Sequence, residues 1–113
     1  MEKRFDVFLL QPAREFLLTL PLAARKKVFY NLERASEKND PELMKKLDGH
    51  IWEFRTLFNG IQYRLLAFWD PGRHRLVIAT HGFIKKTDKV PGREIDRARS
   101  IRQHYLTGKT ELP

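Results

Sequence analysis

Cationic side chains follow one another along three consecutive segments of strand character, in a pattern that could bind a phosphate. They are Arg55, Arg64, His81 and the pair Lys85-Lys86. Paired strands lie about 4.8 Å apart, so three neighbouring strands would gather these groups within roughly 10–15 Å. Arginine offers a planar fork to two phosphate oxygens and lysine offers a point charge. The pattern therefore predicts binding of a phosphodiester.

Such a cluster could also cleave RNA, because RNA carries its own nucleophile in the 2′-hydroxyl. The reaction then needs in-line positioning, a proton acceptor, and cations for the charge that builds on the phosphate. A histidine, or a lysine among other cations, can accept the proton. The sequence has no glycine-rich phosphate loop, no metal-ligand motif and no cysteine. We therefore expect neither a metal nor a cofactor.

Each of these residues also has a structural interpretation. Arg55 and Arg64 could face solvent on an open sheet, and Lys85-Lys86 could belong to a solvated loop. His81 has the alternative of a hydrogen-bonded structural histidine. The tryptophans and phenylalanines lie in strongly apolar segments, which favours a place in the core over a base-stacking role.

The elements that must position these residues follow from hydrophobic periodicity and from proline and glycine. Residues 42–50 form a polar connection, and Asn59-Gly60 is a strong hairpin signal. The order β-α-α-β-β-β-α predicts an α+β fold, with a helical hairpin and a C-terminal helix on an antiparallel sheet. The expected strands are 6–10, 51–57, 62–69 and 75–83, and the expected helices are 13–20, 22–38 and 93–106.

Length and charge bound the class of protein. A chain of 113 residues with 42% hydrophobic residues fits a single domain over 1–113, with roughly the last six residues loose. The net charge is +8; residues 1–50 hold 10 basic and 8 acidic residues, and residues 51–113 hold 12 and 6. This excess predicts a nucleic-acid or acidic protein partner. No secretory signal or membrane span is expected, which favours the cytoplasm.

Three sequence segments resemble the RelE/HigB-type toxins of type II toxin–antitoxin systems, within the RelE/ParE superfamily. The run Leu47 to Arg55, with Trp52-Glu53-Phe54-Arg55, resembles their tryptophan-glutamate-leucine-arginine segment. Tyr63-Arg64 resembles the opening of their next strand. His81-Gly82-Phe83-Ile84-Lys85-Lys86, followed by Pro91 and a helix, is similar to the close of the phage-derived HigB-like branch.

This resemblance implies a RelE-like fold with a curved antiparallel sheet, and a ribosome-dependent mRNA endonuclease (mRNA interferase) that needs no metal. A cognate antitoxin with a helix-turn-helix domain, the ribosome with its rRNA, and mRNA are the implied partners. Arg64 matches the arginine that contacts the scissile phosphate, and Arg55, Lys85 and Lys86 match further basic groups of the site. Glu53 stands where some relatives place a lysine, so the proton acceptor stays open between His81 and a lysine.

Two further groups of residues are expected to bind partners. RNA backbone would contact Lys45, Lys46, Arg97 and Tyr105. The apolar faces of the first two helices would form an antitoxin groove, with Phe16, Leu17, Leu20, Val28 and Phe29.

Other functions remain open from the sequence. The superfamily includes ParE-like toxins, which poison DNA gyrase, although Arg64 and Lys85-Lys86 favour the nuclease. A non-catalytic basic nucleic-acid-binding module would bind RNA in a salt-sensitive way without cutting it. An inactive toxin kept for its antitoxin complex would have nearly the same sequence.

Overall fold

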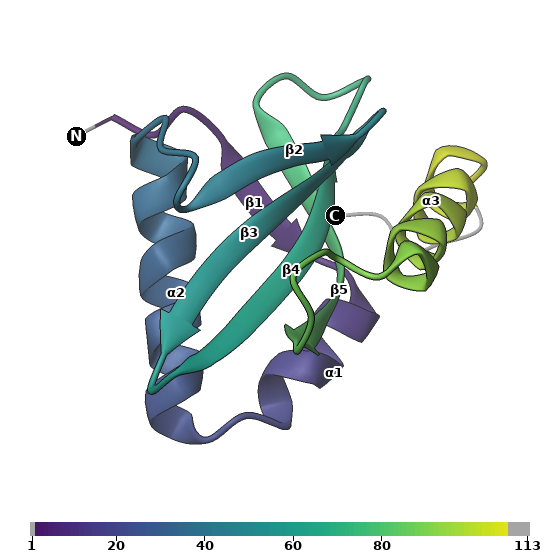
Figure 1. Cartoon of the computed structure of the whole chain (residues 1–113). Helices are drawn as coiled ribbons and strands as arrows, with labels where there is room; N and C mark the ends of the chain where they lie inside the picture. The colour runs from purple at the N-terminus through teal and green to yellow at the C-terminus, as the bar shows by residue number, and fades with distance from the viewer. Residues whose placement is uncertain (1, 109–113) are drawn as a thin grey trace.

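A computed structural model of the chain describes residues 2–108, which contain three helices and five strands (Figure 1). The expected loose residues at the C-terminus include 109–113, which lie outside the described residues. The strands are β1 (Asp6–Leu9), β2 (Met44–Asp48), β3 (Ile51–Phe58), β4 (Ile61–Trp69) and β5 (Leu76–Lys85). The helices are α1 (Gln11–Leu18), α2 (Leu22–Glu37) and α3 (Gly92–Leu106).

The strands form one five-stranded sheet in the order β1-β5-β4-β3-β2. Strands β2 to β5 are antiparallel neighbours, and β1 pairs in parallel with β5. The α+β class and the order of the predicted elements are confirmed. The sheet is mixed rather than wholly antiparallel, because the chain crosses from β1 through α1 and α2 to β2 at the opposite edge and then returns through β3 and β4 to β5 beside β1.

Strand β2 is the element that the sequence analysis missed. Its residues, Met-Lys-Lys-Leu-Asp, lack the apolar alternation of a half-buried strand. It lies at the edge of the sheet, where two lysines and an acid are exposed to solvent and a bulge follows Lys46. Edge strands carry such charges to discourage pairing with other chains, so a polar sequence is compatible with a strand here.

Proline and glycine fix the boundaries between the elements. Pro12 lies in the first turn of α1, and Pro21 and Pro91 directly precede α2 and α3. Proline suits these positions because its preset φ fits the start of a helix, where its missing N–H costs no helical bond. The Asn59-Gly60 turn between β3 and β4 has positive φ at both residues, 51° and 76°, as a type I′ hairpin requires.

The two faces of the sheet are covered differently. Helices α1 and α2 lie over one face and enclose the larger core. Its strand residues include Phe54, Tyr63, Leu65, Val77 and Ala79. Helix α3 covers only part of the opposite face, where Phe68 and Ile78 pack with Tyr105, and Ile51 and Leu66 pack with Ala98. The rest of that face carries the charged side chains described next.

Candidate functional site

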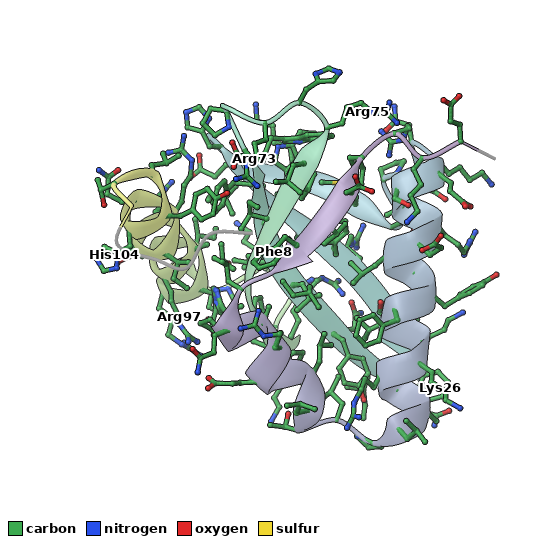
Figure 2. All side chains as sticks on the ribbon, turned by 180° about the vertical axis from the view of Figure 1, so that it is seen from behind. Phe8, Lys26, Arg73, Arg75, Arg97 and His104 are labelled. Carbon is green, nitrogen blue, oxygen red and sulfur yellow. The ribbon has the colours of Figure 1, made fainter. Side chains whose placement is uncertain are left out.

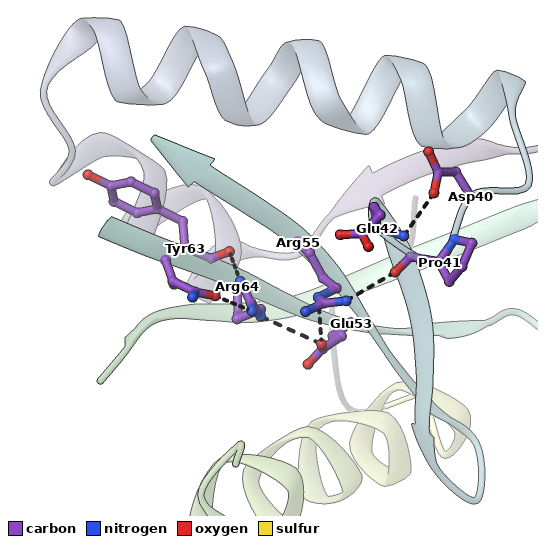
Figure 3. A network of polar contacts seen from close by, with 8 residues as sticks. Asp40, Pro41, Glu42, Glu53, Arg55, Tyr63 and Arg64 are labelled. Carbon is purple, nitrogen blue, oxygen red and sulfur yellow. Dashed lines mark hydrogen bonds and ion pairs between the residues drawn. The ribbon is translucent and has the colours of Figure 1, made fainter. Parts of the chain in front are cut away.

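A carboxylate held between two guanidinium groups lies on the part of the sheet that α3 leaves uncovered (Figure 3). Arg55 on β3 and Arg64 on β4 are directly opposite each other in the sheet register. Glu53 lies two residues before Arg55 and therefore on the same face. Its Oε1 is 3.3 Å from Nε of Arg55 and 3.6 Å from Nε of Arg64. Opposed like charges destabilise a sheet, so Glu53 is needed between them.

The three side chains differ in how far they reach solvent. The side chains of Arg64 and Glu53 are 2% and 5% exposed, whereas that of Arg55 is 28% exposed. Burial lowers the pKa of Arg64, which Glu53 opposes and Arg55 reinforces. The guanidinium of Arg64 also donates hydrogen bonds to Oε1 of Gln62 at 2.5 Å and to the carbonyl of Tyr63 at 3.2 Å. Arg64 is thus fixed beneath the surface, and Arg55 is the arginine that a ligand can reach.

A basic hollow lies beside this triad. Its cationic walls are Lys45 of β2, Arg55, Lys85 at the end of β5, and Lys89 of the loop before α3. Glu53 lies at its inner side; Leu47, Asp88, Val90 and Ile95 complete the lining. Lys45 is the cross-strand partner of Glu53, so strand pairing brings it there. The hollow has a volume of about 340 Å³, at the lower end of the range for small-ligand sites.

His81 lies deep in the sheet and serves to join α3 to it. Its ring is 1% exposed, with Nε2 3.0 Å from Oε1 of Glu94 on α3 and Nδ1 3.0 Å from the hydroxyl of Thr80. Burial lowers its pKa, and the hydrogen bond to the carboxylate of Glu94 opposes this shift. Because both ring nitrogens are engaged inside the protein, the structural interpretation of this histidine replaces the catalytic one.

The structure brings together only some of the residues expected to contact RNA. Lys45 joins the hollow, but Lys46 is on the opposite face of β2, because successive side chains alternate. Lys86, which was expected among the catalytic cations, lies outside the hollow, next to Ile61 and the hairpin turn. Arg97 is exposed on α3 (Figure 2).

Tyr105 is a correction to the expected RNA contacts. It is 6% exposed, packs on Phe68, and donates a hydrogen bond to Asp70 in the β4–β5 connection. That connection is at the opposite end of β4 from the hairpin turn, so the hydroxyl does not face the basic hollow. Burial and the bond to Asp70 raise the pKa of Tyr105 to about 12.

The expected antitoxin groove is also corrected. Leu17, Leu20 and Val28 are buried in the core between the helices and the sheet, so no partner can reach them. Phe16 is half-buried and packs against the same core. Phe29 is the residue of that group with a largely accessible ring, at 46% exposure.

The central role of Glu53 was missed from the sequence. The signal for it was present, since Glu53 and Arg55 are spaced by two residues in a strand and must share a face. Lys89 and Ile95 were also missed, because a loop and a helix bring them to the hollow from a distant part of the chain.

The described residues thus define a class of protein: a small basic α+β domain with a cationic hollow on one sheet face. Within residues 2–108, no group of three or more His, Asp or Glu side chains is arranged to hold a metal ion. None of the helices in this part of the chain is both long and apolar enough to span a membrane.

Comparisons with known proteins identify the family. Residues 15–103 match the model of the phage-derived protein Gp49-like family (DUF891), and the chain belongs to this family. The fold is similar to that of a chain in the crystal structure of the RelBE2 toxin–antitoxin complex from Mycobacterium tuberculosis. The TM-score is 0.57 at 20% identity, over 73% of this chain and 99% of that one. No curated protein matches the sequence.

Proposed function

We propose that this protein is the toxin of a type II toxin–antitoxin system and a HigB-like endoribonuclease that cuts mRNA on the ribosome, in the cytoplasm. The observation that carries the proposal is the basic hollow beside the Arg55–Glu53–Arg64 triad. The fold shared with a chain of a toxin–antitoxin complex supports it. A site built from cations around one carboxylate suits a phosphodiester better than a neutral substrate.

The chemistry follows from RNA itself. The 2′-oxygen loses its proton to an acceptor and attacks the adjacent phosphorus, and the bond from phosphorus to the 5′-oxygen breaks. The 5′-oxygen takes a proton from water, which leaves a 2′,3′-cyclic phosphate and a 5′-hydroxyl. Arg55, the accessible arginine, binds the phosphate oxygens, and Lys45 stabilises the charge that develops on them.

Arg64 has a different role in this proposal from the one that the family resemblance implied. Its guanidinium is buried and bonded to Gln62 and Tyr63, so it acts through Glu53, which orients Arg55. Arg64 is therefore a positioning residue, and Arg55 takes over the contact with the scissile phosphate.

A lysine is the proposed proton acceptor. Of the two candidates, His81 is buried with both ring nitrogens engaged. Lys85 is half-buried and lines the hollow, whereas Lys86 lies outside it. Replacing Lys85 by arginine distinguishes a proton acceptor from a residue that only supplies positive charge. Arginine keeps the charge but does not give up its proton at accessible pH.

The test is growth arrest on induction, with mapping of mRNA 5′ ends in the same cells. Arg55→Ala/Lys85→Ala removes two cations of the hollow and should abolish both arrest and cleavage. Lys26→Ala/Lys38→Ala removes two exposed cations of α2 and its end, away from the hollow, and should leave both intact (Figure 2 shows Lys26). Lys85→Arg should be as inactive as Lys85→Ala if Lys85 accepts the proton.

The alternatives give different outcomes. Arrest without mRNA cleavage would reject the nuclease and favour a gyrase poison. Cleavage that survives Arg55→Ala/Lys85→Ala would reject the hollow as the active site. Salt-sensitive RNA binding without cleavage or arrest would indicate a binding module or an inactive toxin.

A further inference from the structure

The two edges of the sheet differ in how they are protected. Edge strand β2 carries Lys45, Lys46 and Asp48 and contains a bulge, features that prevent another strand from adding. The opposite edge strand, β1, has the sequence Asp-Val-Phe-Leu and pairs with β5 in unbroken register. An apolar, regular edge of this kind is an open template for pairing.

The backbone of β1 offers hydrogen-bonding groups on its outer side. The N–H of Asp6 donates to the carbonyl of Arg75 at 2.8 Å, and that of Leu10 donates to Ala79 at 3.0 Å. Every second residue of a paired strand bonds to the same neighbour, so Asp6, Phe8 and Leu10 face β5. The N–H and C=O of Val7 and the N–H of Leu9 therefore point outward. The carbonyl of Leu9 accepts a bond from Nη1 of Arg14.

A groove runs along this edge between β1 and α2. Phe5, Val7 and Leu9 line it on the strand side, and Phe29 and Leu32 line it on the helix side; Lys3, Glu33 and Ser36 complete the rim. Its volume is about 170 Å³. Figure 2 shows β1 in front of the sheet with α2 alongside. Phe29, the exposed residue among those expected to bind an antitoxin, therefore lines this groove. The buried residues of that group do not line it.

The geometry restricts what can fill the groove. Outward N–H and C=O groups spaced by two residues are met by an extended strand, not by a helix, whose backbone bonds are internal. Alternate side chains of an added strand would point into the groove, so they must be apolar. The remaining side chains would point away from the groove, next to a chain of net charge +8, which favours acids.

We propose that the outer edge of β1 binds an extended segment of a partner protein, with alternating apolar and acidic residues, as an added strand. Its apolar side chains sit against Phe29 and Leu32. The identity of the partner as an antitoxin rests on the proposed function, whereas the mode of recognition does not. The groove lies on the sheet face that α2 covers and the basic hollow lies on the opposite face, so the strand itself leaves the hollow open.

The probe is a short capped peptide of alternating valine and glutamate, titrated into the full chain while backbone amide shifts and hydrogen exchange are followed. Saturable binding should slow exchange at the amides of Val7 and Leu9. Val7→Pro removes an outward N–H without touching the β1–β5 bonds, because proline is tolerated at a strand edge. It should weaken binding about fivefold or more.

A matched pair of variants tests the groove wall. Phe29→Ala removes the exposed ring that lines the groove and should also weaken binding. Tyr30→Ala removes a somewhat more accessible ring on α2 that lies between Lys27 and Arg34 and does not line the groove, so it should bind as the wild type does.

The proposal is overturned if the peptide does not bind up to its solubility limit, or if it binds without slowing exchange at Val7 and Leu9. It is also overturned if Val7→Pro and Tyr30→Ala bind equally well. None of these outcomes bears on mRNA cleavage, which Arg55→Ala/Lys85→Ala tests separately.

Discussion

The two faces of the sheet are covered and stabilised in different ways. Against α1 and α2, the strands present mainly apolar side chains, including Leu65, Ala67, Val77 and Ala79. On the other face the same strands present apolar residues where α3 covers them, and beyond α3 they present Glu53, Arg55 and Arg64 together with the exposed Leu57. The first face is held by packing, and the uncovered part of the second is held by charge pairing.

This difference bears on function. An apolar face covered by two helices has no access for a ligand, whereas a charged region beyond the end of a helix can be approached. The cost is that Arg64 and Glu53 lie out of water, and buried charges are tolerated only when paired. The predictions below disturb one face at a time, in order of expected effect.

The largest loss of stability is expected on the charged face, from Glu53→Ala. It leaves Arg64 buried without its carboxylate, and removing one partner of a buried pair costs about 3–5 kcal/mol of unfolding free energy. Asp48→Ala, which breaks the exposed pair with Arg99, should cost less than about 1 kcal/mol. Urea denaturation of both variants measures the difference.

A double variant shows whether charge pairing or mere volume matters at this position. Glu53→Leu/Arg64→Met replaces the pair by apolar side chains of similar size and should recover most of the lost stability. If Glu53→Ala were as stable as the wild type, the triad would have no structural role, and the contrast between the two faces would fail.

The second-largest loss of stability is expected on the packed face, from Gly82→Ala. A Cβ at this position would lie 2.2 Å from Cδ2 of Phe16 and 2.7 Å from Cδ2 of Leu65, closer than packed carbons approach. Overpacking of this kind costs about 1–3 kcal/mol. Gly72→Ala is the matched control, since its Cβ would meet Oδ1 of Asp70 at an ordinary 3.6 Å. Equal thermal midpoints for the two variants would show that α1 can shift freely on the sheet.

The smallest change in stability is expected from His81, which joins α3 to the sheet. It lies between the part of the second face that α3 covers and the uncovered part. Its pKa is lowered in the folded state, mainly by burial, with Glu94 opposing and Arg97 reinforcing this shift. Protonation therefore favours unfolding. The stability that neutral His81 contributes is fully present above its unfolded pKa of about 6.5 and is lost as the pH falls toward the folded value.

The measurement is urea denaturation between about pH 7.5 and about pH 5, the range in which histidine titrates. His81→Gln should lower stability at the higher pH and reduce the loss on acidification. His74→Gln, at an exposed turn position, should keep the loss seen in the wild type. If both variants lost stability to the same extent on acidification, His81 would not be the source of the pH dependence.

Much of the fold could be predicted from local signals. The prolines before or within the first turn of each helix, the Asn59-Gly60 hairpin, the apolar alternation of β3 and the apolar runs of β4 and β5 all indicate the elements that the structure contains. Strand β2 could not be predicted in this way, because a solvent-exposed edge strand has no apolar face to show in its sequence.

The candidate site, like the fold, could be predicted only in part from the sequence. Sequence alone placed Arg55 and Arg64 on neighbouring strands and Lys85 at a strand end, because strand order and hairpin turns are local properties. It could not say which of them reaches solvent. The engagement of His81 by Glu94 and the place of Tyr105 beside Asp70 depend on where α3 lies, and α3 is distant in sequence from the strands that it covers.

The sequence by itself determined the α+β class, the positive charge and the set of residue types able to hold a phosphate. Only the tertiary structure decided which members of that set form a site, because exposure depends on the elements packed above each strand. The same holds for the β1 edge: the apolar residues of β1 are local, but the groove exists because α2 runs beside it. Hydrophobic periodicity is a property of the local sequence, whereas the covering of strands by helices arises from contacts between distant segments.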